Sequence, residues 1–285
     1  MLHTSPEVVS LIERALAEDQ AFNDPTTGSL VPPELSGVAM VRTKASGVLA
    51  GLAVALAVFR RVDAALTTEA LVEDGTAIGP GDDLAHIQGS VASILRAERT
   101  ALNFLQRLSG IATETSRYVQ AVQGLKARIV DTRKTVPGLR LLDKYAVRVG
   151  GGQNHRLHLA DGVLIKDNHI AALRAQGLSL REVVQRALER APRTLKVEVE
   201  VTSVEEAREA LEAGAQVILL DNMPLAEIRR VVELVGGRAP IEASGGVNLE
   251  TVRAVAETGV DLISVGALTH SVRALDISLE LVQTS

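Results

Sequence analysis

The chain has 285 residues and a formal net charge of −5, with 46% hydrophobic but only 2% aromatic residues. Binding to nucleic acid or to an anionic membrane needs clustered lysine and arginine, and base stacking needs aromatic rings, so we expect neither partner. The chain contains no cysteine, which excludes disulfides, thiolate nucleophiles and thiolate zinc sites.

Two early segments are predicted to be helices. Residues 1–19 place Val8, Leu11, Ile12 and Leu16 at the spacing of an amphipathic helix, and they lack the cationic and apolar regions of an export signal. Residues 47–59 are apolar and uncharged, but 13 residues are too few to cross a membrane, so they indicate a buried helix. We therefore expect a soluble, cytoplasmic protein.

The first 110 residues mix helical and extended patterns without regular alternation. Extended runs occur at 37–43 (GVAMVRT) and 85–91 (AHIQGSV), and a long helical pattern covers 92–110. This order predicts an α+β layer that forms a separate small domain.

From about residue 127 short aliphatic runs alternate with helical stretches. The runs are ARIVDT, GVLIKDN, LKVEVEV, QVILLDN, APIEASGG and LISVGAL. Alternation of strand and helix at this pitch predicts right-handed βαβ units and a parallel sheet, either open or closed into a barrel. Capping boxes at Ser179–Glu182 and Ser203–Glu206 predict two of the helix starts.

Polar residues lie in or directly after each predicted strand of this second half. They are Asp131, Lys166, Glu200, Asp221, Ser244 and Ser264. The carboxyl ends of barrel strands form one mouth, so these side chains together predict a site. Any one of them could be an ordinary polar turn residue, but the whole set favours the site.

Glycine-rich turns follow the last two predicted strands. SGG at 244–246 and SVGA at 264–267 place unhindered backbone N–H groups near helix starts, where barrels commonly bind a phosphate. Glycine is also common where strands merely end. The phosphate site is therefore predicted from the position of these turns after the last two barrel strands, and not from glycine alone.

Basic residues outnumber acidic ones between residues 131 and 158. Arginine forks bind carboxylates and phosphates, so Arg133, Lys134 and Arg156, beside a strand end or a glycine run, predict a pocket for a substrate with several anionic groups. A solvated basic helix face is the expectation for the other three, Arg140, Lys144 and Arg148.

Histidines and carboxylates near this stretch raise the question of a metal ion. The three histidines between residues 155 and 169 match no zinc-ligand spacing and have cationic neighbours, so we expect no zinc site. Glu200 and Asp221, on neighbouring strand ends, suit magnesium, which is usually shared with substrate phosphates. Ion pairs of these carboxylates with Lys134 or Lys166 are compatible with that prediction.

Several of these segments together resemble a known family. DTRKTVPGLR, KYAVRVGGGQNHRLHLADGVLIKDNHI, VEVEV and ILLDNM, in this order and spacing, resemble the quinolinate phosphoribosyltransferases, also called carboxylating nicotinate-nucleotide pyrophosphorylases. The resemblance extends to LAED, DPTT and ERTALNFLQRLSGIAT, and so covers nearly the whole chain.

The resemblance implies an α/β fold in three parts. Residues 1–110 would form an N-terminal α/β sandwich domain, residues 111–270 an incomplete α/β barrel, and residues 271–285 a tail that returns to the first domain. It also implies the reaction of quinolinate with phosphoribosyl pyrophosphate, in the presence of magnesium, in de novo NAD biosynthesis. The products would be nicotinate mononucleotide, pyrophosphate and carbon dioxide.

The resemblance also assigns roles by position. The two quinolinate carboxylates would be held by Arg133, His155, Arg156 and Lys166. The catalytic residues that meet phosphoribosyl pyrophosphate would be Lys134, Glu200 and Asp221, with Glu200 and Asp221 on the magnesium ion. The 5′-phosphate would be received by Ser244, Gly245, Gly246, Ser264 and Gly266. Arg99 would reach into the partner subunit's site, which implies a homodimer or a dimer-based hexamer.

Three alternatives stay open from the sequence. A type II relative could act on another pyridine carboxylate, such as nicotinate. A Schiff-base lyase on a similar barrel could use Lys166 or Lys134 as its amine. The third is a non-catalytic protein that binds a pyridine carboxylate or a phosphate.

Overall fold

The computed structural model describes residues 2–284, and the chain divides into two compact units. The first unit comprises Met1–Ser116, Val136–Gly151 and Val272–Ser285. The second comprises Arg117–Thr135 and Gly152–Ser271. The domain boundaries at residues 110 and 270 stay predictions.

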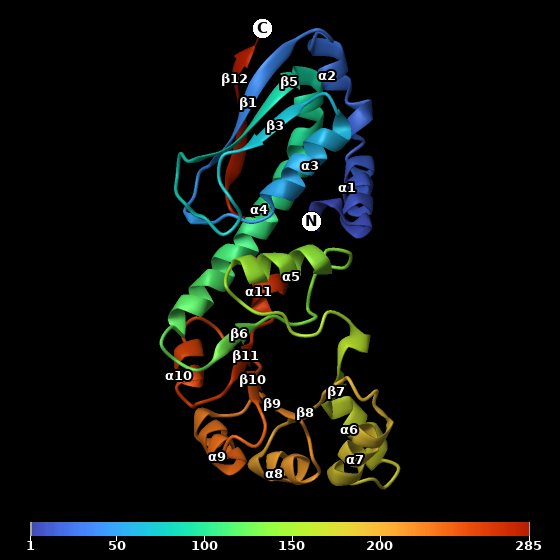
Figure 1. The fold of residues 1–285 in the computed structure, drawn as a ribbon, viewed down its shortest axis with the longest axis vertical. Coiled ribbons are helices and arrows are strands. Elements are labelled where there is room, and N and C mark those ends of the chain that lie inside the picture. Colours follow the sequence, from blue (N-terminus) through green and yellow to red (C-terminus); the bar gives the residue numbers. More distant parts are fainter. Residues whose placement is uncertain (1, 285) are drawn as a thin grey trace. The chain divides into compact units, whose positions relative to one another are not determined.

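An antiparallel sheet forms the centre of the first unit (Figure 1). Its order is β12-β1-β5-β3, with β1 at Ser36–Thr43, β3 at Thr67–Ala70, β5 at Asp83–Ser90 and β12 at Ile277–Thr284. Burial alternates along β1, as expected for a strand with one covered face. A second, two-stranded sheet joins β2, Gly47–Val48, to β4, Ala77–Ile78.

The helices of the first unit cover the predicted helical segments. They are η1 (Leu2–Thr4), α1 (Pro6–Glu18), η2 (Ala21–Asn23), α2 (Pro25–Leu30), α3 (Leu52–Val62), α5 (Arg140–Val149) and the first part of α4 (Val91–Ala121). Helix α1 buries Val8, Ile12 and Leu16, which confirms the amphipathic helix, while Leu11 is only half-buried. Helix α3 buries most of its apolar side chains, which confirms the buried helix from Leu52 onward, but the predicted start at residue 47 is wrong, because Gly47–Val48 form β2.

Helix α5 corrects one expectation. We predicted a solvated basic face, but the Lys144 side chain is only 2% exposed, so that prediction is wrong for Lys144. Neighbouring positions of the helix are covered as well, because Leu142, Asp143, Ala146 and Val147 are also buried. Regular spacing of charges on a helix does not reveal whether another element covers that face.

A parallel sheet of six strands forms the second unit. Its order is β6-β11-β10-β9-β8-β7, with β6 at Arg128–Val130, β7 at Val163–Ile165, β8 at Val197–Val201, β9 at Val217–Asp221, β10 at Ile241–Ser244 and β11 at Leu262–Ser264. All six predicted strands are therefore confirmed. The edges at β6 and β7 agree with an incomplete barrel, and the fold class is α/β as predicted.

Helices follow the strands of this sheet, as βαβ units require. They are η3 (Leu159–Asp161), α6 (Asp167–Arg174), α7 (Leu180–Arg190), α8 (Val204–Glu212), α9 (Leu225–Val235), α10 (Val252–Ala256) and α11 (Ala267–His270). The capping box of Ser179 and Glu182 is present in full. Ser203 accepts the Glu206 N–H, but the Glu206 carboxylate bonds to Thr202 instead, so this box is only half formed.

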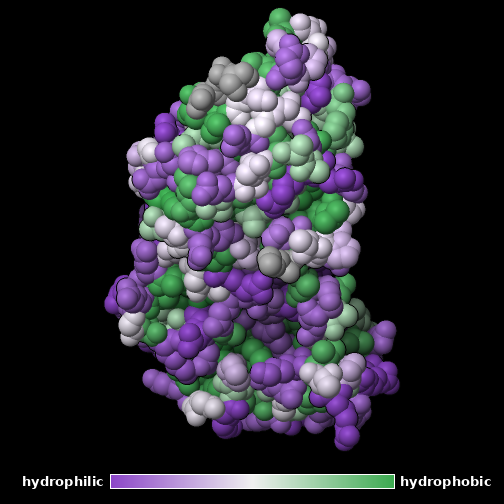
Figure 2. Space-filling model, turned by 45° about the horizontal axis from the view of Figure 1, so that its top comes forward, coloured by the Kyte–Doolittle hydropathy of each residue, from purple (hydrophilic) through white to green (hydrophobic). Residues whose placement is uncertain are grey.

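The surface carries mixed polarity. Figure 2 shows one face, on which hydrophilic (purple) residues are spread between smaller hydrophobic (green) patches. Among the residues that the structure describes, no helix combines the length and the apolar composition needed to span a membrane.

Candidate active site

A cavity of about 590 Å³ lies at the carboxyl ends of the strands in the second unit. It contains every predicted site residue except Arg99, Asp131 and Gly266, and Asp131 is fully buried, where its carboxylate accepts hydrogen bonds from His155 and Asn154. The lining of the cavity is Thr132, Arg133, Lys134, His155, Arg156, Leu164, Lys166, Glu200, Leu219, Asp221, Asn222, Glu242, Ser244, Gly245, Gly246 and Ser264. Five of the six predicted strand-end residues, all except Asp131, therefore converge on this cavity, while the role of each residue stays a prediction.

Two arginines form a cationic part of this cavity. Arg133 follows β6, and its buried Nε has no hydrogen-bond partner within residues 2–284. The Arg156 Nη1 donates to the carbonyl of Gly162 at 3.0 Å. Burial and the nearby charge of Arg133 lower the pKa of Arg156. Two guanidinium groups in one cavity suit an anionic ligand that offers more than one oxygen pair.

His155 is fixed by the protein at three points. Its N–H donates to the buried Asp131 carboxylate at 2.8 Å, and its Nδ1 accepts the Arg156 N–H at 2.8 Å. A neutral imidazole that accepts at Nδ1 carries its proton on Nε2, which lies 3.2 Å from Glu198 Oε2. Both ring nitrogens are therefore engaged inside the protein, and direct contact of His155 with a substrate carboxylate stays a prediction.

Glu198 and Glu242 form a buried carboxyl pair beneath His155. Glu242 is 1% exposed, and its Oε2 lies 3.6 Å from His155 Nε2. Burial raises the pKa of Glu242 to about 7, and the charge of Glu198 adds to the rise while His155 opposes it. Two carboxyls in a dry environment share a proton more readily than they ionise together.

Glu200 and Asp221 form the acidic side of the cavity. They lie on the neighbouring strands β8 and β9, which pair in parallel. Burial raises the pKa of Glu200, which Lys166 opposes and the Asp221 charge reinforces. Lys166 Nζ is 3.7 Å from Glu200 Oε2, so the expected ion pair is present, although the exposure of Lys166 keeps its contribution to stability small.

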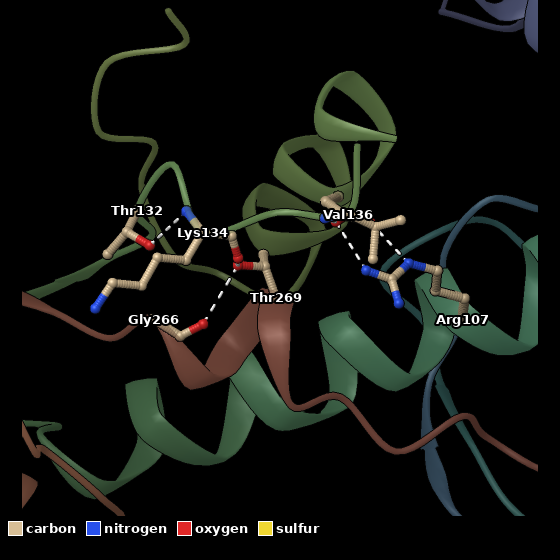
Figure 3. Close-up of polar contacts among 7 residues, drawn as sticks. Arg107, Thr132, Lys134, Val136, Gly266 and Thr269 are labelled. Atoms are coloured by element: carbon tan, nitrogen blue, oxygen red, sulfur yellow. Dashed lines mark hydrogen bonds and ion pairs between the residues drawn. The ribbon is translucent and has the colours of Figure 1, made fainter. Parts of the chain in front are cut away.

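Lys134 is held by backbone contacts after β6 (Figure 3). Its N–H donates to the Thr132 hydroxyl at 3.1 Å, and its carbonyl accepts the Thr269 hydroxyl of α11 at 2.8 Å. Gly266 lies beside the Lys134 stem, because a Cβ at that position would be 3.1 Å from Lys134 Cδ. Gly266 thus leaves room for Lys134, a function that its glycine-turn pattern did not reveal.

The two glycine-rich turns differ in their relation to helices. Gly245 and Gly246 both have positive φ, 91° and 61°, which favours glycine at these positions. Helix α10 begins only at Val252, whereas α11 begins directly after Gly266. The predicted helix start beside the turn is confirmed for 264–267 and is wrong for 244–246, where Asn248 first caps a separate turn by accepting two N–H groups.

Two cavity residues, Glu242 and Asn222, and the adjacent Glu198 were not predicted from the sequence. Glu242 and Glu198 sit inside aliphatic strands, and an acidic residue within such a strand was the available signal. Glu198 precedes Glu200 by two positions, so alternation places both side chains on the same face of β8. Asn222 follows Asp221 in a left-handed conformation that sequence does not specify.

Arg99 and the other histidines lie elsewhere. Arg99 is exposed on α4 in the first unit and does not line this cavity. His158 contacts Asp161 at 3.1 Å, while His169 Nδ1 accepts the Lys166 N–H. The absence of a zinc site stays a prediction.

Two groups of side chains offer ligand atoms for a metal ion. His155, Glu198 and Glu242 bring one ligand atom each within 4.8 Å of the others. A proton on His155 Nε2 opposes metal coordination through this nitrogen, because coordination needs the lone pair that the proton occupies. Glu200 and Asp221 offer hard oxygen donors at the open cavity, a donor set that suits magnesium and leaves positions for phosphate oxygens.

The fold and cavity define an α/β protein of the incomplete-barrel type, with a strand-end cavity lined by both cationic and anionic side chains. Models of the N-terminal and C-terminal domains of quinolinate phosphoribosyl transferase match residues 24–109 and 111–280. The chain therefore belongs to the quinolinate phosphoribosyl transferase family.

Individual relatives match over most of their length. The chain is 47% identical to nicotinate-nucleotide pyrophosphorylase [carboxylating] of Mycobacterium leprae, covering 95% of each chain. It is 44% identical to quinolinate phosphoribosyltransferase [decarboxylating] 2, mitochondrial, of Nicotiana glauca, over 98% of this chain and 83% of the relative. The crystal structure of NadC from Streptococcus pyogenes has a TM-score of 0.92 at 41% identity, over 98% of this chain and 96% of that one.

Proposed function

We propose that this chain transfers the phosphoribosyl group of phosphoribosyl pyrophosphate to quinolinate, with loss of carbon dioxide, and so forms nicotinate mononucleotide for NAD biosynthesis. The observation that carries this conclusion is a single cavity in which Arg133 and Arg156 accompany Glu200 and Asp221. Quinolinate carries two neighbouring carboxylates, which match the guanidinium groups. The second substrate carries a diphosphate that is normally bound with a divalent cation, which matches the acidic pair.

The quinolinate half of the site consists of Arg133, Arg156 and Lys166. The unpaired Arg133 Nε–H is a donor that a carboxylate oxygen would satisfy. His155 supports this half from the wall, where its backbone and ring are fixed by Asp131 and Glu198. The cations must orient the departing carboxylate without overstabilising it, because only binding that strengthens in the transition state accelerates the step.

The sugar half consists of Lys134, Glu200, Asp221 and the glycine turns. Glu200 and Asp221 would hold magnesium, and the bound ion would neutralise part of the negative charge of the diphosphate. The same carboxylates stabilise positive charge at the ribose carbon as its bond to the diphosphate breaks. We assign the 5′-phosphate to the remaining polar and glycine residues, Ser244, Gly245, Gly246, Ser264 and Gly266.

The proposed reaction has two chemical steps, transfer of the phosphoribosyl group and loss of carbon dioxide. The quinolinate nitrogen attacks the ribose carbon while pyrophosphate leaves, so the ring nitrogen becomes cationic. The neighbouring carboxylate then departs as carbon dioxide, its bonding electrons stay on the ring carbon, and that carbon takes a proton from solvent. No protein nucleophile is required for either step.

Arg99 belongs to a further part of the proposal. It is exposed on α4, and we propose that it completes the site of a second copy, with a homodimer as the smallest active assembly. A cytoplasmic location likewise stays a prediction.

A direct assay tests the proposed function. Purified protein is incubated with quinolinate, phosphoribosyl pyrophosphate and magnesium, and nicotinate mononucleotide is measured by chromatography, with each component omitted in turn. We expect product only when all three are present. Product from nicotinate but not from quinolinate would select the relative with another substrate. Trapping of a carbonyl compound on Lys134 or Lys166 by borohydride would select the lyase, and binding without turnover would select the non-catalytic protein.

A further inference from the structure

Asn222 has an unusual backbone conformation for its place in the cavity. Its φ is 53°, and within residues 2–284 the one other non-glycine residue with positive φ is Gln20, in the first unit. Asparagine tolerates this region better than most residues, but an L side chain there is uncommon and worth explaining. Asn222 directly follows β9 and lines the cavity beside Asp221.

The Asn222 amide contacts the acidic side of the site. Its Nδ2 donates to Asp221 Oδ2 at 2.9 Å, while its backbone N–H donates to the carbonyl of Ser244 at 2.9 Å. Hydrogen bonds to an ionised carboxylate are stronger than those between neutral groups. The side-chain bond restricts one Asp221 oxygen and adds no charge to the cavity.

The same amide packs on the glycine turn after β10. A Cβ added to Gly245 would overlap the amide atoms of Asn222, and the φ of 91° at Gly245 independently favours glycine. Asn222 therefore touches both parts of the sugar half, the Asp221 carboxylate and the turn 244–246. None of these contacts involves Arg133, Arg156 or Lys166.

We propose that Asn222 is a positioning residue for the sugar-diphosphate substrate: its amide holds the Asp221 carboxylate in one orientation against the Gly245 turn. This inference rests on the proposed function and deepens it, because it names the residue that sets the geometry of the acidic pair. Asp221 Oδ1 is left for the metal-bound diphosphate. Loss of the amide affects phosphoribosyl pyrophosphate and magnesium, and leaves quinolinate binding intact.

Matched variants separate the side chain from the backbone. Asn222→Gly removes the amide but retains access to positive φ, so it isolates the hydrogen bond. Gly245→Ala displaces the amide from the opposite side. Gln20→Gly is the control, because it makes the same kind of change in the first unit, where Gln20 is exposed.

The experiment measures equilibrium binding and kinetics on the full chain. Binding of phosphoribosyl pyrophosphate is titrated calorimetrically at several magnesium concentrations without quinolinate, and KM is measured for both substrates. For Asn222→Gly we expect both the Kd and the KM of phosphoribosyl pyrophosphate to rise about tenfold, as for loss of one charge-assisted hydrogen bond, with quinolinate KM changed less than about twofold. Half-saturation by magnesium should rise as well, Gly245→Ala should reproduce the defect, and Gln20→Gly should not.

Two results would overturn the inference. One is a folded Asn222→Gly variant with wild-type affinity for phosphoribosyl pyrophosphate and wild-type magnesium dependence. The other is an equal rise in the quinolinate KM, which would indicate general damage to the cavity. Wild-type protein that binds phosphoribosyl pyrophosphate but forms no nicotinate mononucleotide would contradict the proposed function alone, because the binding titration still decides the role of Asn222.

Discussion

Buried charges have different surroundings in the two units. In the first unit the fully buried Asp143 carboxylate accepts two hydrogen bonds from Arg107, at 2.9 and 2.8 Å. In the second unit the buried Arg133 Nε–H has no partner among the described residues, and Arg156 lies near that like charge. An ion pair whose hydrogen bonds are all made within the protein stabilises the fold. A buried donor in a cavity that makes no such bond is available to a ligand. The difference separates structural charges from those that we assign to binding.

The largest expected effect is on the Arg107–Asp143 ion pair. Arg107→Met leaves Asp143 buried without its partner, which should lower the free energy of unfolding by about 3–5 kcal/mol. Urea unfolding followed by circular dichroism measures this loss. Arg61→Met, which removes the exposed contact with Glu13, should have little effect. Equal losses in the two variants would contradict the distinction between buried and exposed pairs.

The next effect is on the two arginines of the cavity. Arg133→Ala or Arg156→Ala should raise the KM for quinolinate about 100-fold, because a substrate carboxylate loses its buried charged partner. Steady-state kinetics at saturating phosphoribosyl pyrophosphate measure this change. Arg148→Ala, at an exposed position on α5, is the control. A marked loss of thermal stability in the Arg133 variant would indicate a structural role and break the comparison.

The Glu198–Glu242 pair gives a pH-dependent effect. The pKa of Glu242 is raised to about 7 in the folded protein, so folding favours the protonated acid. Its stabilising contribution is complete below the ordinary pKa of a glutamic acid and is lost as pH rises through about 7. Glu242→Gln mimics the neutral form and should remove this dependence.

Unfolding free energies measured between pH 4.5 and 8 should therefore diverge. We expect the wild type to lose on the order of 2 kcal/mol relative to Glu242→Gln across this range, since two ionised carboxyls would face each other in a buried site. If the unfolding free energies of the two proteins changed with pH in parallel, Glu242 would ionise normally. The carboxyl pair would then make no pH-dependent contribution to stability.

The smallest expected effect is at a helix cap, where the loss of unfolding free energy measures the contribution of a purely local hydrogen bond. Ser179→Ala removes the hydroxyl that accepts the Glu182 N–H and should cost about 1 kcal/mol. Ser203→Ala at the half-formed box should cost less, because the Glu206 carboxylate is bonded to Thr202 rather than to Ser203. Thermal unfolding of the two variants compares them, and a greater loss at Ser203 would contradict the assignment.

Strand-end residues were predictable because their placement follows from local pattern and chain direction. Each aliphatic run became a parallel strand, and parallel strands direct Lys166, Glu200 and Asp221 to the same edge. Contacts across the sheet were not predictable in the same way. The approach of His155 to Glu198 and Glu242 joins positions 43 and more residues apart, and no local pattern encodes that distance.

The amino-acid sequence alone determined the parallel α/β unit, the family resemblance and most members of the cavity, because hydrophobic period and strand order are local properties. Tertiary structure alone decided that Lys144 is buried, that Asp143 pairs with Arg107, that Glu242 has a raised pKa, and that the Asn222 amide donates a hydrogen bond to Asp221. Burial and the distance between charges arise only when separate segments pack together, and these two quantities set the energy of an ionisable group.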